Sequence, residues 1–125
     1  MPKKVIQVPG QKPSPVLSFV TEANGFVFVA GLVGNDPDTG TVPPGGFEAE
    51  CRQMLENVGR MLRAAGLDYS DAVRCTVYLT DHDNFATYNA IYKEYFHTDP
   101  QARASVRVAG LVPPYTIEIE ITAAR

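Results

Sequence analysis

Alternation of apolar and polar residues predicts several strands in the first part of this chain. Residues 17–23 and 26–34 flank Asn24-Gly25, the dipeptide that best tolerates the positive φ angles of a two-residue hairpin turn, and residues 5–8 form a shorter strand-like run. Residues 26–33 are apolar at nearly every position. Such a run is typical of a central strand that is covered on both faces. The pattern therefore predicts a hairpin whose second strand lies inside a sheet.

Apolar residues at three- and four-residue spacing predict two helices, over residues 47–65 and 84–96. Gly66 is placed to end the first helix, and Asp81 or Asp83 is placed to cap the second. The second helix is rich in aromatic residues, which could form a stacking platform for bases but at this spacing more often belong to a core. We expect both apolar faces to pack against the sheet. Residues 72–80, between the helices, predict another strand.

Two strands with one polar face each are predicted near the end of the chain, over residues 101–108 and 116–121. We expect their polar residues to face away from the helices; these are Arg103, Ser105, Arg107, Glu118 and Glu120. The apolar residues between them should face the helices; these are Val106, Val108, Ile117, Ile119 and Ile121. A guanidinium and a carboxylate would then share one sheet surface. One interpretation is a solvated face with cross-strand ion pairs, each worth about 0.2–1 kcal/mol.

The predicted order of strands and helices is typical of an α+β fold, a mixed sheet with two helices on one face. The chain has 125 residues, which is enough for one compact domain with a core and too few for two ordinary ones. We therefore assign residues 1–125 to a single domain.

Composition narrows the possible partners. The formal net charge is −3 and the cationic residues are scattered, so the basic surface typical of nucleic-acid binding is absent from the sequence. The longest apolar run is far shorter than a membrane span and no secretory segment is evident, so we expect a soluble, cytoplasmic protein without membrane partners. Cys51 and Cys75 are expected to be buried free thiols, and His82 and His97 stand singly, so no metal is assigned.

Short motifs distinguish this chain from a generic α+β domain. ARASV occupies residues 102–106, AGL residues 109–111 and IEIE residues 117–120; Asn24-Gly25, a DPDTG turn at residues 36–40 and VYLTD at residues 77–81 precede them. In order and spacing these segments resemble the RidA family, also called the YjgF family, whose members include enamine and imine deaminases. The resemblance covers nearly the whole chain.

The resemblance implies a chorismate-mutase-like fold assembled as a homotrimer, with three sites in clefts between subunits. It implies hydrolysis of 2-imino and enamino acids to 2-keto acids and ammonia, without an organic cofactor or a metal. Arg103 matches the family's carboxylate-binding arginine, and a guanidinium can give a carboxylate two parallel charge-assisted hydrogen bonds. Glu118 matches the glutamate that positions the attacking water, and Gly31 the glycine at which the backbone approaches substrate.

Three positions of the implied binding site depart from many deaminating members. Leu17 stands where they carry tyrosine, Ala30 where they carry serine, and Ser105 where they carry cysteine. Loss of a phenol at position 17 and of a hydroxyl at position 30 makes part of the pocket wall more apolar, so we expect the preferred substrate to differ or turnover to be slow. Phe19 or Tyr115 is a candidate to replace the missing aromatic contact.

Other functions stay open at this point. The chain could be a noncatalytic trimer that binds small carboxylates through Arg103, or a related hydrolase acting on another imine-like compound. An endoribonuclease role, also attached to the family, is disfavoured by the acidic charge balance and by the lack of a basic and aromatic surface.

Overall fold

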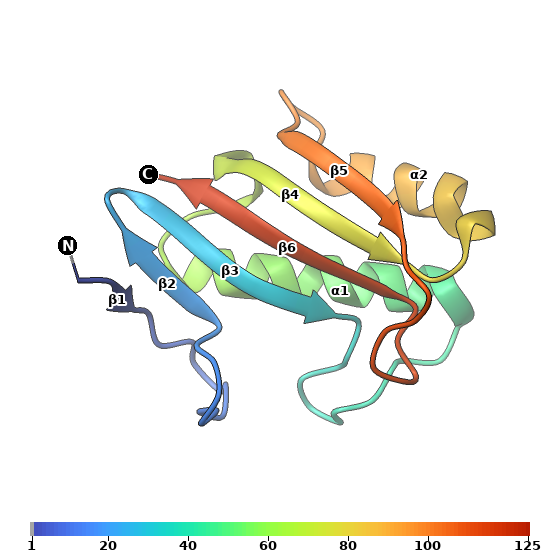
Figure 1. Ribbon diagram of the computed structural model, residues 1–125, viewed down its shortest axis with the longest axis horizontal. Helices are drawn as coiled ribbons and strands as arrows, with labels where there is room; N and C mark the ends of the chain where they lie inside the picture. Colours follow the sequence, from blue (N-terminus) through green and yellow to red (C-terminus); the bar gives the residue numbers. More distant parts are fainter. Residues whose placement is uncertain (1) are drawn as a thin grey trace.

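The computed structural model describes residues 2–125 as a six-stranded sheet with two helices on one face (Figure 1). The strand order is β1-β2-β3-β6-β4-β5. The strands are β1 Lys4–Val5, β2 Val20–Ala23, β3 Phe26–Val33, β4 Ala72–Leu79, β5 Ala102–Arg107 and β6 Ile117–Ala124. The helices are α1 Gly46–Ala64 and α2 Phe85–Tyr95, and the short 3₁₀ turns η1 Tyr69–Asp71 and η2 His82–Asn84 precede β4 and α2. The predicted α+β class and element order are confirmed.

The predicted hairpin at Asn24-Gly25 is present. Both residues have positive φ angles, 53° and 81°, and the flanking pair Ala23 and Phe26 is in register between β2 and β3. Glycine adopts such angles without a steric penalty, and asparagine tolerates them better than most residues. The strands around the hairpin are shorter than predicted, since β2 begins only at Val20 and Leu17 lies outside it.

Strand β6 occupies the middle of the sheet, antiparallel to β3 on one side and to β4 on the other. Strand β5 pairs in parallel with β4, which requires a crossover, and α2 supplies it. The edge strand β5 therefore lies beside the helix that precedes it, as Figure 1 shows. This places the start of β5 against the aromatic side of α2.

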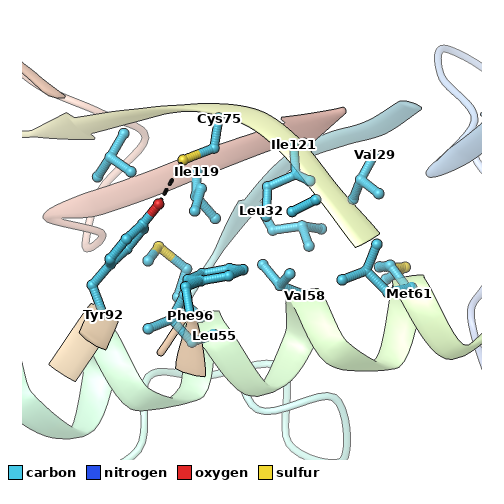
Figure 2. Packing of buried hydrophobic residues seen from close by; sticks show 14 of the residues in the cluster. Val29, Leu32, Leu55, Val58, Met61, Cys75, Tyr92, Phe96, Ile119 and Ile121 are labelled. Carbon is cyan, nitrogen blue, oxygen red and sulfur yellow. Dashed lines mark hydrogen bonds between the residues drawn. The ribbon is translucent and has the colours of Figure 1, made fainter. Parts of the chain in front are cut away.

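The core lies between the sheet and the two helices (Figure 2). Leu55, Val58 and Met61 of α1 are buried beneath Ile119 and Ile121 of β6. Three residues of α2 are also buried, together with the residue that follows the helix: Tyr88, Ile91, Tyr92 and Phe96. The predicted role of both helices in the core is therefore confirmed.

The predicted end of the first helix and the predicted state of the cysteines are confirmed, whereas the predicted cap of the second helix is wrong, since Asp81 caps the 3₁₀ turn η2 and the N-cap of α2 is Asn84. Helix α1 ends next to Gly66, whose backbone N–H donates to the carbonyl of Arg63, while the N–H of Leu67 donates to that of Leu62. The Asp81 carboxylate accepts a hydrogen bond from the N–H of Asp83 at the start of η2. Cys51 and Cys75 are free and buried, and burial raises the pKa of Cys51 to about 12.

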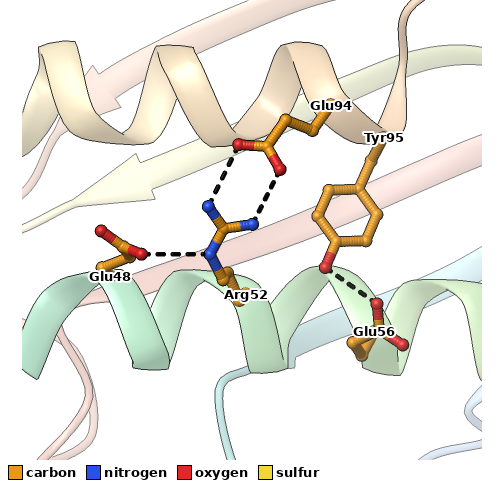
Figure 3. A network of polar contacts seen from close by, with 5 residues as sticks. All are labelled: Glu48, Arg52, Glu56, Glu94 and Tyr95. Atoms are coloured by element: carbon orange, nitrogen blue, oxygen red, sulfur yellow. Dashed lines mark hydrogen bonds and ion pairs between the residues drawn. The ribbon is translucent and has the colours of Figure 1, made fainter. Parts of the chain in front are cut away.

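Polar contacts join the two helices at their surface (Figure 3). Arg52 of α1 donates from Nη1 and Nη2 to the two oxygens of Glu94 on α2, at 2.9 and 3.1 Å, and also pairs with Glu48. The hydroxyl of Tyr95 donates to Glu56 at 2.8 Å. A bidentate contact fixes orientation better than a single hydrogen bond does, so this contact helps to hold α2 in a defined position against α1.

One prediction about β3 is wrong in the single chain. Val27 and Val29 are buried under the helices, but Phe26 and Phe28 on the other face are 45% and 44% exposed. The reason is that both helices pack on one side of the sheet, which leaves the opposite face, here called the outer face, without a covering layer. The apolar run therefore marks a strand that is central in the order of the sheet and covered on one side.

The predicted orientation of β5 is also wrong. In the parallel register, Arg103 pairs with Cys75 and Ser105 with Val77, and both partners are buried beneath the helices. Because paired residues point to the same face, Arg103, Ser105 and Arg107 lie on the helix side, and Val106, predicted to face the core, is 42% exposed on the outer face. The orientation predicted for Glu118 and Glu120 is confirmed, since Ile117, Ile119 and Ile121 of β6 are buried between them.

Candidate functional site

Arg103 lies at the edge of the sheet over the aromatic residues of α2. Its guanidinium carbon is 4.6 Å from the centre of the Tyr92 ring and 5.2 Å from that of Tyr88, with Phe85 at 6.0 Å. Its Nη1 donates a hydrogen bond of 2.8 Å to Oδ1 of Asn89. A cation over aromatic faces is attracted by the ring quadrupole. The rings and the amide together hold the guanidinium in place without neutralising its charge.

A cavity of about 250 Å³ opens beside this guanidinium. Its lining comes from α2, from the end of that helix and from the start of β5: Asn89, Tyr92, Lys93, Phe96, Pro100, Gln101 and Arg103. The lining contains two cations and no carboxylate. A cationic cavity of this size is suited to a small anion, and a fork-shaped guanidinium favours a carboxylate.

Ser105 is turned towards α2. Its hydroxyl lies 3.0 Å from that of Tyr88, and a hydrogen bond joins them. Tyr88 is fully buried, and this burial raises its pKa to about 12. The predicted binding residue Ser105 therefore lies on the same face as Arg103, and its hydroxyl already has a partner within the chain.

Glu118 lies on the outer face, beside an irregularity in β3. The register between β3 and β6 shifts between Val29 and Leu32, so Ala30 and Gly31 form a bulge next to the glutamate. A Cβ atom at position 31 would collide with Oε2 of Glu118, so any other residue there would require the carboxylate to move. Burial, and second the charge of Glu120, raises the pKa of Glu118 above its ordinary value of 4.5.

The structure brings the predicted site residues together in two groups rather than one. Arg103 and Ser105 lie on the helix side of the sheet, whereas Gly31, Ala30 and Glu118 lie on the outer face. The expected proximity of Arg103 and Glu118 on one surface is therefore wrong for the single chain, because β5 faces the other way. Among residues 2–125, no ion pair joins Arg103 to a carboxylate, so the cross-strand ion-pair interpretation fails as well.

Leu17 lies apart from both groups. It is 46% exposed and lines a cavity of about 200 Å³ near the N-terminus, together with Phe19 and Val5 of β1. Tyr115 lies in the connection before β6, where its N–H donates to the carbonyl of Val112. Neither Phe19 nor Tyr115 lines the cavity of Arg103, so neither replaces the missing aromatic contact within a single chain.

Sequence reasoning missed the residues that hold the site in place. Asn89 was not singled out, although it stands one position from Tyr88 on a helix face that meets β5. Glu50 is buried, and its carboxylate accepts hydrogen bonds from the N–H and the hydroxyl of Thr116, at 2.7 and 2.6 Å. These two bonds fix the chain just before β6 and so help to place Glu118. The sequence signal that could have identified Glu50 is a carboxylate at a position that belongs to the apolar face of α1.

Comparison with known proteins shows the family of this chain. A family model described as Endoribonuclease L-PSP matches residues 10–125. The chain belongs to the RidA/YjgF family. A family member from Rattus norvegicus, named 2-iminobutanoate/2-iminopropanoate deaminase, is 44% identical over 97 residues, which cover 78% of this chain and 71% of the rat protein.

Solved structures in the RidA/YjgF family share the fold over nearly the full length. The Rid family protein YyfA from Yersinia pestis has a TM-score of 0.93 and 29% identity, covering 99% of this chain and 100% of its own. The TdcF protein from E. coli, solved with bound serine, has a TM-score of 0.87 and 33% identity, covering 98% of each chain. Within residues 2–125 no helix is long and apolar enough to cross a membrane, and no cluster of three or more His, Cys, Asp or Glu side chains is placed to hold a metal ion.

The raised pKa of Glu118 predicts that this residue destabilises the fold at neutral pH. A folded-state pKa above the unfolded value means that the native state holds the proton more tightly, so the free energy of unfolding falls as pH rises from the ordinary value of 4.5. Glu118→Gln removes this titration. We expect a higher urea midpoint than wild type at pH 7 and a difference that shrinks at about pH 4. A lower midpoint at pH 7, or a difference independent of pH, would contradict the burial of this carboxylate.

Proposed function

We propose that this protein hydrolyses 2-imino acids and their enamine tautomers to 2-keto acids and ammonia, at sites shared between subunits of a homotrimer. The observation that carries the proposal is the state of Arg103. Its partners in the chain are neutral, an amide and aromatic rings, and it borders a cavity without a carboxylate. An arginine held in this way is ready to bind a substrate carboxylate through two charge-assisted hydrogen bonds.

Glu118 supplies the second chemical requirement. A carboxylate of raised pKa is a stronger base than an ordinary one, and it can orient a water molecule and accept its proton. Glu118 takes one proton from the water as its oxygen bonds to the imine carbon, and passes that proton to the imine nitrogen, which gives a neutral tetrahedral amino alcohol. Glu118 then takes the hydroxyl proton and delivers it to the amino group as the carbon–nitrogen bond breaks, which releases ammonia and leaves the 2-keto acid. No redox step and no cofactor enter this balance.

A second subunit is needed because the two groups lie on opposite faces of one sheet. A small substrate bound at Arg103 is separated from the Glu118 of the same chain by the sheet itself. The outer face also exposes apolar side chains, with Phe26, Phe28 and Val106 each more than 40% exposed. Such a face is typical of a protein interface. Placing the outer face of one subunit beside the β5 edge of the next would bring Glu118 and Arg103 to one cleft, and the family resemblance supports three copies.

The departures at positions 17, 30 and 105 bear on the choice of substrate. Ala30 contributes only a methyl group to the bulge, and the Ser105 hydroxyl is engaged by Tyr88. The wall opposite the carboxylate anchor is therefore less polar than in members that carry hydroxyl groups there. RNA cleavage, which the description of the family model suggests, finds little support in a chain of net charge −3.

Substitution of Arg103 tests the carboxylate anchor. Arg103→Ala should weaken binding of a stable 2-keto acid product by about 10²–10⁴-fold, since each lost charge-assisted bond is worth about 1.5–3 kcal/mol. Arg103→Lys should recover only part of the affinity, because an ammonium does not reproduce the planar fork. Isothermal titration with pyruvate measures both effects. Equal affinity for the wild type and both variants would remove the carboxylate site.

Substitution of Glu118 tests the chemical step and separates an enzyme from a noncatalytic binder. Glu118→Gln keeps the size of the side chain but removes the charge that orients the water and accepts its proton. We expect pyruvate binding close to wild type and a turnover of in situ generated 2-iminopropanoate lower by about 10²–10⁴-fold. Release of keto acid above the uncatalysed rate is the readout. A protein whose wild type does not exceed that rate, yet binds pyruvate, is a carboxylate-binding trimer instead.

Mixed assemblies test the sharing of sites between subunits. Arg103→Ala and Glu118→Gln should each be inactive alone, but after unfolding and refolding together they should recover roughly a quarter of wild-type activity, the fraction of sites that receive one intact residue from each neighbour. The control is the double variant refolded with Arg103→Ala, which should stay inactive. No recovery, or a mass near the monomer's 13.6 kDa by light scattering at micromolar concentration, would contradict the shared site.

A further inference from the structure

We propose that the cavity beside Arg103 binds a second acidic group, so that the protein prefers 2-imino acids whose side chain ends in a carboxylate. This inference rests on the proposed function and adds the class of substrate to it. Its basis is Lys93, which lines the same cavity as Arg103. The net charge of the chain is −3, yet this cavity is lined by two cations and by no acidic residue.

The position of Lys93 on α2 fits this role. Lys93 follows Asn89 by four residues, so the two lie on the same side of the helix, with Cβ atoms about 5–6 Å apart. Asn89 holds the guanidinium of Arg103 at 2.8 Å. The Lys93 side chain therefore leaves α2 about one helical turn from the residue that holds the carboxylate anchor. Two cations attached at this spacing suit the two carboxylates of a short diacid.

No acidic side chain of the described chain neutralises Lys93. The ion pairs found within residues 2–125 are formed by Arg52 and Arg125. The adjacent Glu94 gives both of its oxygens to Arg52, as Figure 3 shows, and so points towards α1 rather than to the cavity. The helix places no Asp or Glu three or four residues from Lys93. Its charge therefore remains available to a ligand.

Arg103 and Lys93 differ in geometry, and this difference indicates which end of the substrate each of them binds. Arg103 is fixed by rings and an amide, and its fork suits the carboxylate beside the imine carbon, whose position the reaction must control. Lys93 is an exposed point charge on a flexible stem and suits a carboxylate at the end of a side chain of variable length. The cavity of about 250 Å³ between them is large enough for such a side chain.

The test compares a diacid with a monoacid in the wild type and in Lys93→Met, which keeps the length of the side chain and removes its charge. Isothermal titration gives the affinities for 2-oxoglutarate and for pyruvate. We expect the wild type to bind 2-oxoglutarate more tightly, and we expect Lys93→Met to lower the ratio of the two affinities by roughly 1.5- to fivefold, the range of an exposed ion pair. Added salt should lower the wild-type ratio in the same direction.

Lys3→Met is the matched control, because Lys3 is also exposed and is not among the residues that line the Arg103 cavity. It should leave the ratio unchanged. An affinity ratio that Lys93→Met does not alter would overturn the inference, whatever the turnover measurements show. Hydrolysis of imines prepared in situ from alanine and glutamate is measured in parallel. If neither imine is hydrolysed faster than in buffer, the proposed function fails, while the binding ratio still decides whether the cavity accepts a diacid.

Discussion

The alternation of isoleucine and glutamate in β6 is the constraint on which the rest of the structure depends. The strand is hydrogen-bonded on both edges, to β3 and to β4. Its register therefore determines which side chains of these neighbouring strands point to each face of the sheet. Ile117, Ile119 and Ile121 are almost completely buried under the helices, and a shift by one residue would place glutamates there instead. The cost of burying unpaired carboxylates makes this register the only acceptable one. Glu118 is thereby committed to the outer face.

The same register commits Arg103 to the opposite side. Strand β4 links the side-chain orientation of β6 to that of β5, because Cys75 pairs with Ile121 on one edge and with Arg103 on the other, and paired residues point to the same face. An arginine on the helix side of a sheet is tolerable here because β5 is an edge strand and α2 offers aromatic faces and one amide. The position of α2 is in turn held by the Tyr92 contact with Cys75 and by Arg52 (Figures 2 and 3). The placement of the proposed anchor for an anion is therefore a consequence of packing around a core helix.

The sequence predicted the elements well because their signals are local. Asn24-Gly25, the apolar spacing of α1 and the isoleucines of β6 each depend on a few neighbouring residues. The facing of β5 was predicted wrongly because alternation in that strand gives two weak faces, alanine and valine against arginine and serine. The rule that polar residues face away from helices fails where a helix carries its own polar partners, as Asn89 and Tyr88 do. The correct facing depends on the register with β4, which no local pattern reveals. Site residues such as Arg103 and Glu118 could be named from family motifs, but their separation by the sheet required the structure.

The features that weaken the fold are concentrated around Glu118, and this distribution suits a base better than an anchor. A bulge interrupts the pairing of β3 with β6, a glycine in a strand costs about 0.5–1 kcal/mol relative to alanine, and the carboxylate itself is penalised by burial. The bulge and the glycine leave room for the Glu118 carboxylate on an apolar surface, and burial raises the basicity of this carboxylate. Arg103, by contrast, is surrounded by favourable contacts that fix its direction. A binding group gains from such preorganisation, whereas a group that must accept a proton gains from a destabilised charge. The division of the two groups between the faces of one sheet allows each environment to be built without compromising the other.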